Sequence, residues 1–160
     1  MDQIDAVLIA LRKVIRATDL HSKYLAKTSG LTTAQLLILQ SIQNMGEVSI
    51  GEISKKISLS QATVTSILDR LVDKGLVYRE RSTEDKRKVH AYLTEDAVAL
   101  IKDAPAPLQE QFTKQFEALN EWEQSMMISS LQRIAQMMDA EEIDASPVLD
   151  IGILDRKNPN

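Results

Sequence analysis

Residues 49–94 read SIGEISKKISLSQATVTSILDRLVDKGLVYRERSTEDKRKVHAYLT, and this stretch decides the fold. Ser49 and Glu52 have the spacing of a capping box. In that motif the serine oxygen accepts the backbone N–H three residues on, and the glutamate reaches back to the serine N–H. This start predicts a short helix that ends near Ile57. After a tight turn, Ser60 is placed to cap a second helix.

The second helix has one apolar face. Its apolar residues recur at i, i+3, i+4, i+7 and i+8, namely Val64, Ile67, Leu68, Leu71 and Val72. Leu59 precedes the cap and can pack against Val64 as a hydrophobic staple, which fixes the angle between the two helices. Gly75 follows the last turn, where a left-handed C-cap is expected. One face is therefore assigned to the core, and the small polar face opposite remains for a partner.

A charged hairpin follows the second helix. Residues 76–81 and 88–93 read as strands, and residues 82–87 form a polar turn between them. Thr94 caps the next helix, and residues 47–49 can add a short third strand. The plan is a winged helix-turn-helix, so the predicted fold is mainly α with a small β-hairpin wing.

Two functions fit this plan. A helix with small polar residues at its exposed N-terminal end suits the DNA major groove, where base edges carry a full donor and acceptor code. A winged helix without DNA binding can instead bind another protein, because a fold does not fix a function. The second hypothesis predicts weak, salt-insensitive interaction with any duplex.

The charge distribution favours DNA. The chain has a net charge of −4, yet residues 55–92 hold nine Lys or Arg against five acids, a net charge of +4. The remainder carries −8. Basic charge is concentrated where phosphates would lie, and the acidic remainder can repel DNA from other faces.

Two segments also resemble a known family. LSQATVTSILDRLVDKGLV (59–77) and RSTEDKRKVHAYLT (81–94) are similar to the recognition helix and wing of the MarR family of bacterial transcription regulators. The family's wing signature, Asp-x-Arg followed by Leu-Thr, is present as Asp85-Lys86-Arg87 and Leu93-Thr94. The resemblance is strong over this centre and looser in the flanks. It implies a homodimeric repressor that binds a pseudo-palindromic operator in double-stranded DNA and responds to a small molecule or to ionic conditions.

The same resemblance divides the chain and assigns roles. It implies one chain, 1–160, with a winged helix-turn-helix lobe at 31–94, dimerisation helices at 2–28 and 95–140, and an extension at 141–160. The residues expected to face bases are Ser60, Gln61, Ala62, Thr65 and Ser66. Those expected near phosphates are Lys55, Lys56, Thr63, Arg70 and Lys88. Arg87 would enter the minor groove, and Asp85 would brace Arg87 or close the wing turn.

The base-facing end of the helix contains no arginine or lysine, so the strong bidentate contact to guanine is missing there. Gln61 can read adenine, and Ala62 or Thr65 can contact thymine methyl groups. We therefore expect an operator that leans toward A·T pairs and is partly read by shape.

The flanking helices carry apolar stripes. Residues 2–28 hold Ile4, Val7, Leu8, Leu11, Val14 and Ile15 on one face, and the last helix holds Met127, Leu131, Ile134 and Met138 at seam spacing. Intrachain core is one reading; the resemblance favours a seam that is partly intersubunit. Pro105 and Pro107 should end or kink the helix between these parts, which departs from the long helix of the family.

Composition bounds the remaining functions. The sequence has no cysteine, which excludes a disulfide, and no apolar run near the ~20 residues of a membrane span. Residues 1–13 do not read as a signal peptide, so a cytoplasmic protein is expected. His21 is expected at the surface, in a ligand pocket or at the dimer interface, and His90 is expected to face solvent or phosphate. No nucleophile, metal or cofactor motif accompanies them, so we expect neither an enzyme nor a metal or cofactor site.

The effector is the least determined feature. Sparse aromatic residues could line a ligand site or simply belong to the core; they are Tyr24, Phe112, Phe116 and Trp122. A response to ionic strength needs no pocket, because phosphate binding is itself salt-dependent. The extension is too apolar for a loose tail. We expect it to cover the dimer domain and to fray at 157–160. It faintly resembles that of MarR-type regulators of compatible-solute genes, which implies a role in osmotic stress.

Overall fold

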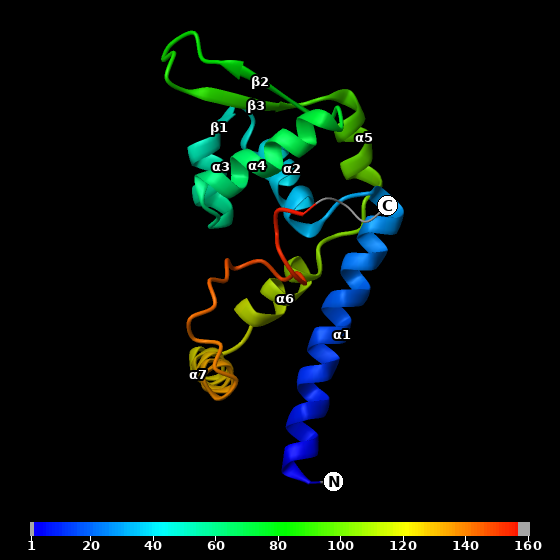
Figure 1. Cartoon of the computed structure of the whole chain (residues 1–160), viewed down its shortest axis with the longest axis vertical. Helices are drawn as coiled ribbons and strands as arrows, with labels where there is room; N and C mark the ends of the chain where they lie inside the picture. The colour runs from blue at the N-terminus through cyan, green and yellow to red at the C-terminus, as the bar shows by residue number, and fades with distance from the viewer. Residues whose placement is uncertain (1, 157–160) are drawn as a thin grey trace.

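The computed structural model describes residues 2–156, which form seven helices and three short strands. In chain order the elements are α1 (Gln3–Ser29), α2 (Thr33–Met45), β1 (Val48–Ser49), α3 (Ile50–Ile57), α4 (Gln61–Asp73), β2 (Val77–Arg81), β3 (Val89–Leu93), α5 (Glu95–Asp103), α6 (Leu108–Glu117) and α7 (Glu121–Met137). Figure 1 shows a lobe made of α2–α5 and the sheet at one end, with α1, α6 and α7 extending away from it. The predicted class, mainly α with a small wing, is confirmed.

The sheet has the order β1-β3-β2, and both pairings are antiparallel. The predicted third strand is present, because Val48 pairs with Ala91 and Ser49 with His90. The β2–β3 hairpin projects from the lobe as the wing (Figure 1). Beneath the sheet lies one apolar core, and α2 and α4 contribute half of its buried side chains.

Side-chain caps fix where the helices of the lobe begin. The Ser49 hydroxyl accepts the Glu52 N–H at 3.2 Å, and the Glu52 carboxylate accepts the Ser49 N–H at 3.0 Å, as the capping box predicts. Thr32 and Gln35 form the same reciprocal pair at α2. The Ser60 hydroxyl accepts the Thr63 N–H at 3.1 Å and so starts α4. The turn between α3 and α4 is sharp because Ser58 adopts a left-handed φ of 54°.

The flanking helices leave broad apolar faces uncovered. Ile4 of α1 is 66% exposed and Leu131 of α7 is 58% exposed, although both belong to the predicted stripes. The N-terminal turns of α1 and the last turns of α7 line a common apolar hollow. As predicted, the prolines interrupt the helix: α5 ends at Asp103, and α6 begins after Pro107.

The segment after α7 runs back to the lobe. Figure 1 shows it passing α6 and reaching the region beneath α4. Its Val148 and Leu154 pack against the core of the lobe. The prediction that this extension covers the dimerisation helices is therefore incomplete, since only its middle contacts α1 and α6. The predicted fraying at 157–160 lies outside the described residues.

Candidate nucleic-acid interface

Helix α4 is held by one face and presents its N-terminal end. Val64, Ile67, Leu68 and Leu71 are buried in the core, which confirms the predicted stripe. Ser60, Gln61 and Ala62 are exposed at the start of the helix. The first four backbone N–H groups of any α-helix lack intrahelical partners, so this end of α4 also carries partial positive charge. The geometry suits approach to a polyanion.

The polar face of α4 is less open toward its C-terminal half. Thr63, Thr65, Ser66 and Arg70 are all half-buried. The Asp69 carboxylate forms an ion pair with Arg79 of β2 at 2.7 Å, which ties α4 to the wing. The α4 positions predicted to face bases and phosphates thus lie on one face of the helix. Among them, only those at the first turn of α4 are fully exposed to solvent.

Ser66 and Arg70 are occupied by the segment after α7. The Arg70 Nε donates to Asp155 Oδ1 at 2.7 Å, and the Ser66 hydroxyl donates to the other carboxylate oxygen. Burial raises the pKa of the Asp155 carboxyl, but hydrogen bonds from Arg70 and Ser66 lower it by more, so the net pKa lies below its usual value. Sequence reasoning missed this residue, because the contact spans 85 residues and the segment has no periodic pattern.

Basic side chains flank the start of α4. Lys55 and Lys56 are exposed in the last turn of α3, beside the turn that leads into α4. Lys88 is exposed immediately before β3, the second strand of the wing. Their ammonium groups are accessible to DNA phosphates. A lysine contacts a phosphate as a point charge, and such a contact does not depend on the base sequence.

The wing turn displays one arginine. The side chain of Arg87 is 91% exposed. The Asp85 carboxylate accepts both the Arg87 backbone N–H, at 3.1 Å, and the Arg87 Nε, at 3.2 Å. These two hydrogen bonds from Arg87 hold the pKa of the Asp85 carboxyl below its ordinary value. The predicted contact between Asp85 and Arg87 is therefore confirmed, and it both closes the turn and orients the guanidinium.

The base of the wing is stiffened by side chains on the sheet. Tyr78 and Tyr92 stack with ring centroids 5.3 Å apart, and the Tyr92 hydroxyl donates to Glu47 at 3.0 Å. Burial and the Glu47 carboxylate raise the pKa of the Tyr92 hydroxyl. His90 lies 3.2 Å from the same carboxylate and is only 16% exposed. The prediction that His90 faces solvent or phosphate is wrong, because its side chain is largely buried and lies against the Glu47 carboxylate.

His21 also has an internal role. It lies half-buried on α1, and its Nε2 accepts the backbone N–H of Leu108 at 3.1 Å. That N–H belongs to the first residue of α6, which has no intrahelical partner of its own. His21 thus anchors the start of α6 on α1.

The four aromatic ligand candidates do not converge. Phe112 and Phe116 of α6 stack with centroids 5.7 Å apart and line an apolar groove with Met127 of α7. Tyr24, on α1, is 56% exposed, and Trp122, at the start of α7, is 64% exposed. Neither Tyr24 nor Trp122 lines the groove of the two phenylalanines.

Two kinds of site are not found within residues 2–156. No group of three or more His, Cys, Asp or Glu residues in this part of the chain is arranged to hold a metal ion. None of the helices described here combines the length and apolar character needed to cross a membrane.

The fold and the exposed start of α4 define a winged helix-turn-helix protein of the DNA-binding class. The sequence model of the MarR family matches residues 31–89, and a helix-turn-helix regulator of Bacillus subtilis, YcgE, is 30% identical over 130 residues, which cover 81% of this chain and 84% of YcgE. The chain therefore belongs to the MarR family of transcription regulators.

Two further relatives span nearly the whole chain. The helix-turn-helix transcriptional repressor MdtR of Bacillus subtilis is 27% identical over 142 residues, covering 89% of this chain and 90% of MdtR. The structure of BpsR from Bordetella bronchiseptica is similar with a TM-score of 0.53 and 28% identity, covering 84% of this chain and 96% of that one. That structure concerns the mechanism by which 6-hydroxynicotinic acid regulates the DNA binding of BpsR.

Proposed function

We propose that the chain acts as a homodimeric transcriptional repressor that binds a near-palindromic operator through α4 and the wing. The observation that carries this proposal is the joint exposure of the α4 start, the lysines at the end of α3 and Arg87 on one lobe. The family supports regulation of transcription rather than catalysis, and the relative MdtR is itself a repressor. The cytoplasm, where prokaryotic DNA lies, is the proposed location.

Base reading is assigned to the first two turns of α4. Gln61 and Ala62 are free to contact base edges, and Thr65 and Ser66 follow on the same face. A glutamine is suited to adenine and a small apolar side chain to the thymine methyl group. This composition supports an operator that is rich in A·T pairs, where the narrow minor groove also favours Arg87.

Dimerisation is assigned to α1 and α7, with α6 between them. Their uncovered apolar faces are larger than scattered surface residues would explain, and they lie away from the lobe (Figure 1). Paired recognition helices contact half-sites one helical turn apart, so the operator half-sites should be centred about 10 bp apart.

The test separates Arg87 from general charge. Arg87→Ala should weaken binding to the duplex upstream of the protein's own gene at least tenfold in fluorescence anisotropy, and Arg87→Lys should recover only part of the loss, because lysine is more strongly hydrated. The control is Arg133→Ala on α7, which removes the same charge outside the lobe.

Asp85→Ala distinguishes an oriented arginine from a charged loop. The change removes a negative charge from the wing, so simple electrostatics predicts tighter binding. Loss of the two hydrogen bonds from Arg87 predicts weaker binding instead. A variant that binds DNA more tightly than the parent would contradict the bracing role.

A small-molecule effector is also proposed, with the groove of Phe112, Phe116 and Met127 as its candidate site. Support comes from the aromatic and apolar lining and from BpsR, whose DNA binding is regulated by a small aromatic acid. A thermal-shift screen of aromatic acids against the parent and Phe112→Ala tests it: a compound that stabilises only the parent supports this site.

A further inference from the structure

We propose that residues 148–156 form an internal competitor for DNA, which we call the latch, and that Asp155 has to leave α4 before that helix can enter a major groove. The inference rests on the proposed function, since it assigns regulation to the same face of α4.

Asp155 offers α4 the chemistry of a DNA phosphate. Its two carboxylate oxygens accept from Arg70 Nε and from the Ser66 hydroxyl. Arginine and hydroxyl side chains are the donors that proteins direct at phosphate oxygens, and they hold carboxylates by the same charge-assisted bonds. These donors cannot serve Asp155 and DNA at the same time.

The latch also occupies space along α4. Val148, Gly152 and Leu154 line one hollow together with Thr63, and Asp155 contacts α4 two turns later at Arg70. The major groove is about 12 Å wide and a helix with its side chains is about 10–12 Å across, so the groove admits one helix. No room remains for a second chain segment that follows the helix for two turns.

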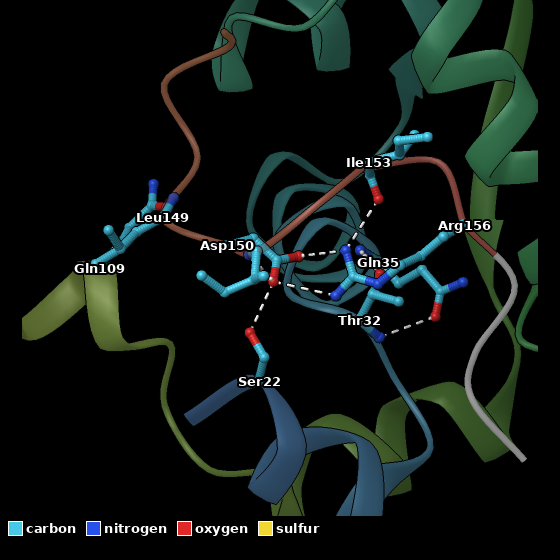
Figure 2. Close-up of polar contacts among 9 residues, drawn as sticks. Ser22, Thr32, Gln35, Gln109, Leu149, Asp150, Ile153 and Arg156 are labelled. Carbon is cyan, nitrogen blue, oxygen red and sulfur yellow. Dashed lines mark hydrogen bonds and ion pairs between the residues drawn. The ribbon is translucent and has the colours of Figure 1, made fainter. Parts of the chain in front are cut away.

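The latch is attached by a built set of contacts. The Asp150 side chain has no exposed surface and accepts from the Ser22 hydroxyl at 2.7 Å and from two nitrogens of Arg156, each at 3.0 Å. The Leu149 N–H donates to Gln109 of α6 at 3.0 Å. Figure 2 shows Asp150 at the centre, between Ser22 of α1 and Arg156. The latch therefore joins α1 and α6 to the recognition helix.

The charge of this region opposes DNA as well. Residues 141–156 contain five acids and a single basic residue, Arg156, a net charge of −4. This segment lies on a lobe whose central stretch carries +4. DNA meets a partly neutralised surface while the latch is closed. Because only the open form binds, the apparent affinity falls in proportion to the fraction of open molecules.

The experiment compares three variants by fluorescence anisotropy with a labelled duplex from upstream of the gene and a scrambled duplex of equal composition. Asp155→Asn removes the ion pair with Arg70, and Leu154→Ala loosens the latch without changing charge. Glu142→Gln is the matched control, since it removes one negative charge at an exposed position of the same segment. We expect binding at least threefold tighter for the first two variants and within twofold of the parent for the control.

Hydrogen–deuterium exchange supplies a readout that charge alone would not move. In the parent, saturating duplex should speed exchange of the Leu149 amide, which is protected by Gln109 in the closed latch. Unchanged protection in the complex would overturn the proposal, because the latch would then stay closed on DNA.

The remaining outcomes are also decisive. If the parent binds DNA and the variants Asp155→Asn and Leu154→Ala bind it no more tightly than the parent does, the latch proposal is wrong and the proposed DNA-binding function still stands. If Asp155→Asn and Glu142→Gln increase the affinity for DNA equally and Leu154→Ala does not increase it, the effect comes from net charge alone. That result also overturns the latch proposal. If neither the parent nor any variant binds either duplex at a salt concentration of about 50 mM, the proposed function is wrong, and the latch proposal is wrong with it.

Discussion

Replacement of Asp150 by asparagine should release the segment that follows α7 while the lobe stays folded. The aspartate accepts hydrogen bonds from Ser22, from the Ile151 N–H and from two nitrogens of Arg156. Asparagine keeps the size of the side chain but turns an NH₂ group toward these donors. The Arg156 guanidinium then loses its negative partner, and water does not reach the Asp150 side chain, which has no exposed surface.

The expected magnitude follows from these contacts. Breaking a buried ion pair by removing one partner costs about 3–5 kcal/mol. Arg156 keeps 27% of its side-chain surface exposed, so its guanidinium can turn toward water after the change. We therefore expect a loss of about 2–3 kcal/mol in the free energy that keeps this segment attached, below the full cost for a buried pair.

Hydrogen exchange at the Leu149 amide measures this loss directly. Since about 1.4 kcal/mol is a factor of ten, exchange should accelerate about 30- to 150-fold. Amides in α2 should be unaffected, because the core of the lobe opens only on global unfolding. Asp144→Asn, an exposed change in the same segment, is the control. An acceleration below threefold, or an equal acceleration in α2, would refute the reasoning.

Four further predictions address the interface. Light scattering should show a dimer at micromolar concentration, because the apolar faces of α1 and α7 are uncovered in one chain; a monomer would contradict the assignment. Gln61→Ala should weaken operator binding by roughly 1–3 kcal/mol more than binding to random DNA, whereas Lys55→Ala should weaken both equally and reduce the salt slope; an unchanged preference among operator variants would show that Gln61 does not read bases. Ser60→Ala removes the cap of α4 and should cost about 1 kcal/mol of stability in a denaturant titration; no loss would mean the hydroxyl contributes nothing. The lowered pKa of Asp155 means that its stabilising contribution is complete above its unfolded pKa of about 3.9 and is lost as pH falls through the folded value. Protection of the Leu149 amide should therefore be constant from about pH 5 to 8 and fall below about pH 4, with Asp155→Asn showing a smaller fall; equal pH profiles would exclude Asp155 as the cause.

The winged lobe could be predicted because its determinants are local. Ser49 meets Glu52 three residues away, and Asp85 meets Arg87 two residues away, so each contact is readable from spacing alone. The same holds for the prolines that separate α5 from α6, since a proline restricts its own backbone and that of the residue before it.

The rest of the site depends on contacts between distant segments. His21 receives the Leu108 N–H across 87 residues, and Asp155 reaches Ser66 across 89 residues. No spacing rule links such positions, and the segment after α7 has neither helical nor strand periodicity to orient it. The acidic residues there could be counted from the sequence, but the one that reaches α4 could not be chosen.

The separation of 128 positions along the chain from Ser22 to Asp150 also sets an order of events during synthesis of the chain. The buried core of the lobe is drawn from residues 25–97, whereas the contacts that cover α4 come from residues 148–156. At about 5–20 residues per second, a ribosome needs roughly 3–12 s to make the intervening and covering residues. A nascent lobe can therefore fold with its recognition helix uncovered, and a chain interrupted after α7 would remain in that state permanently.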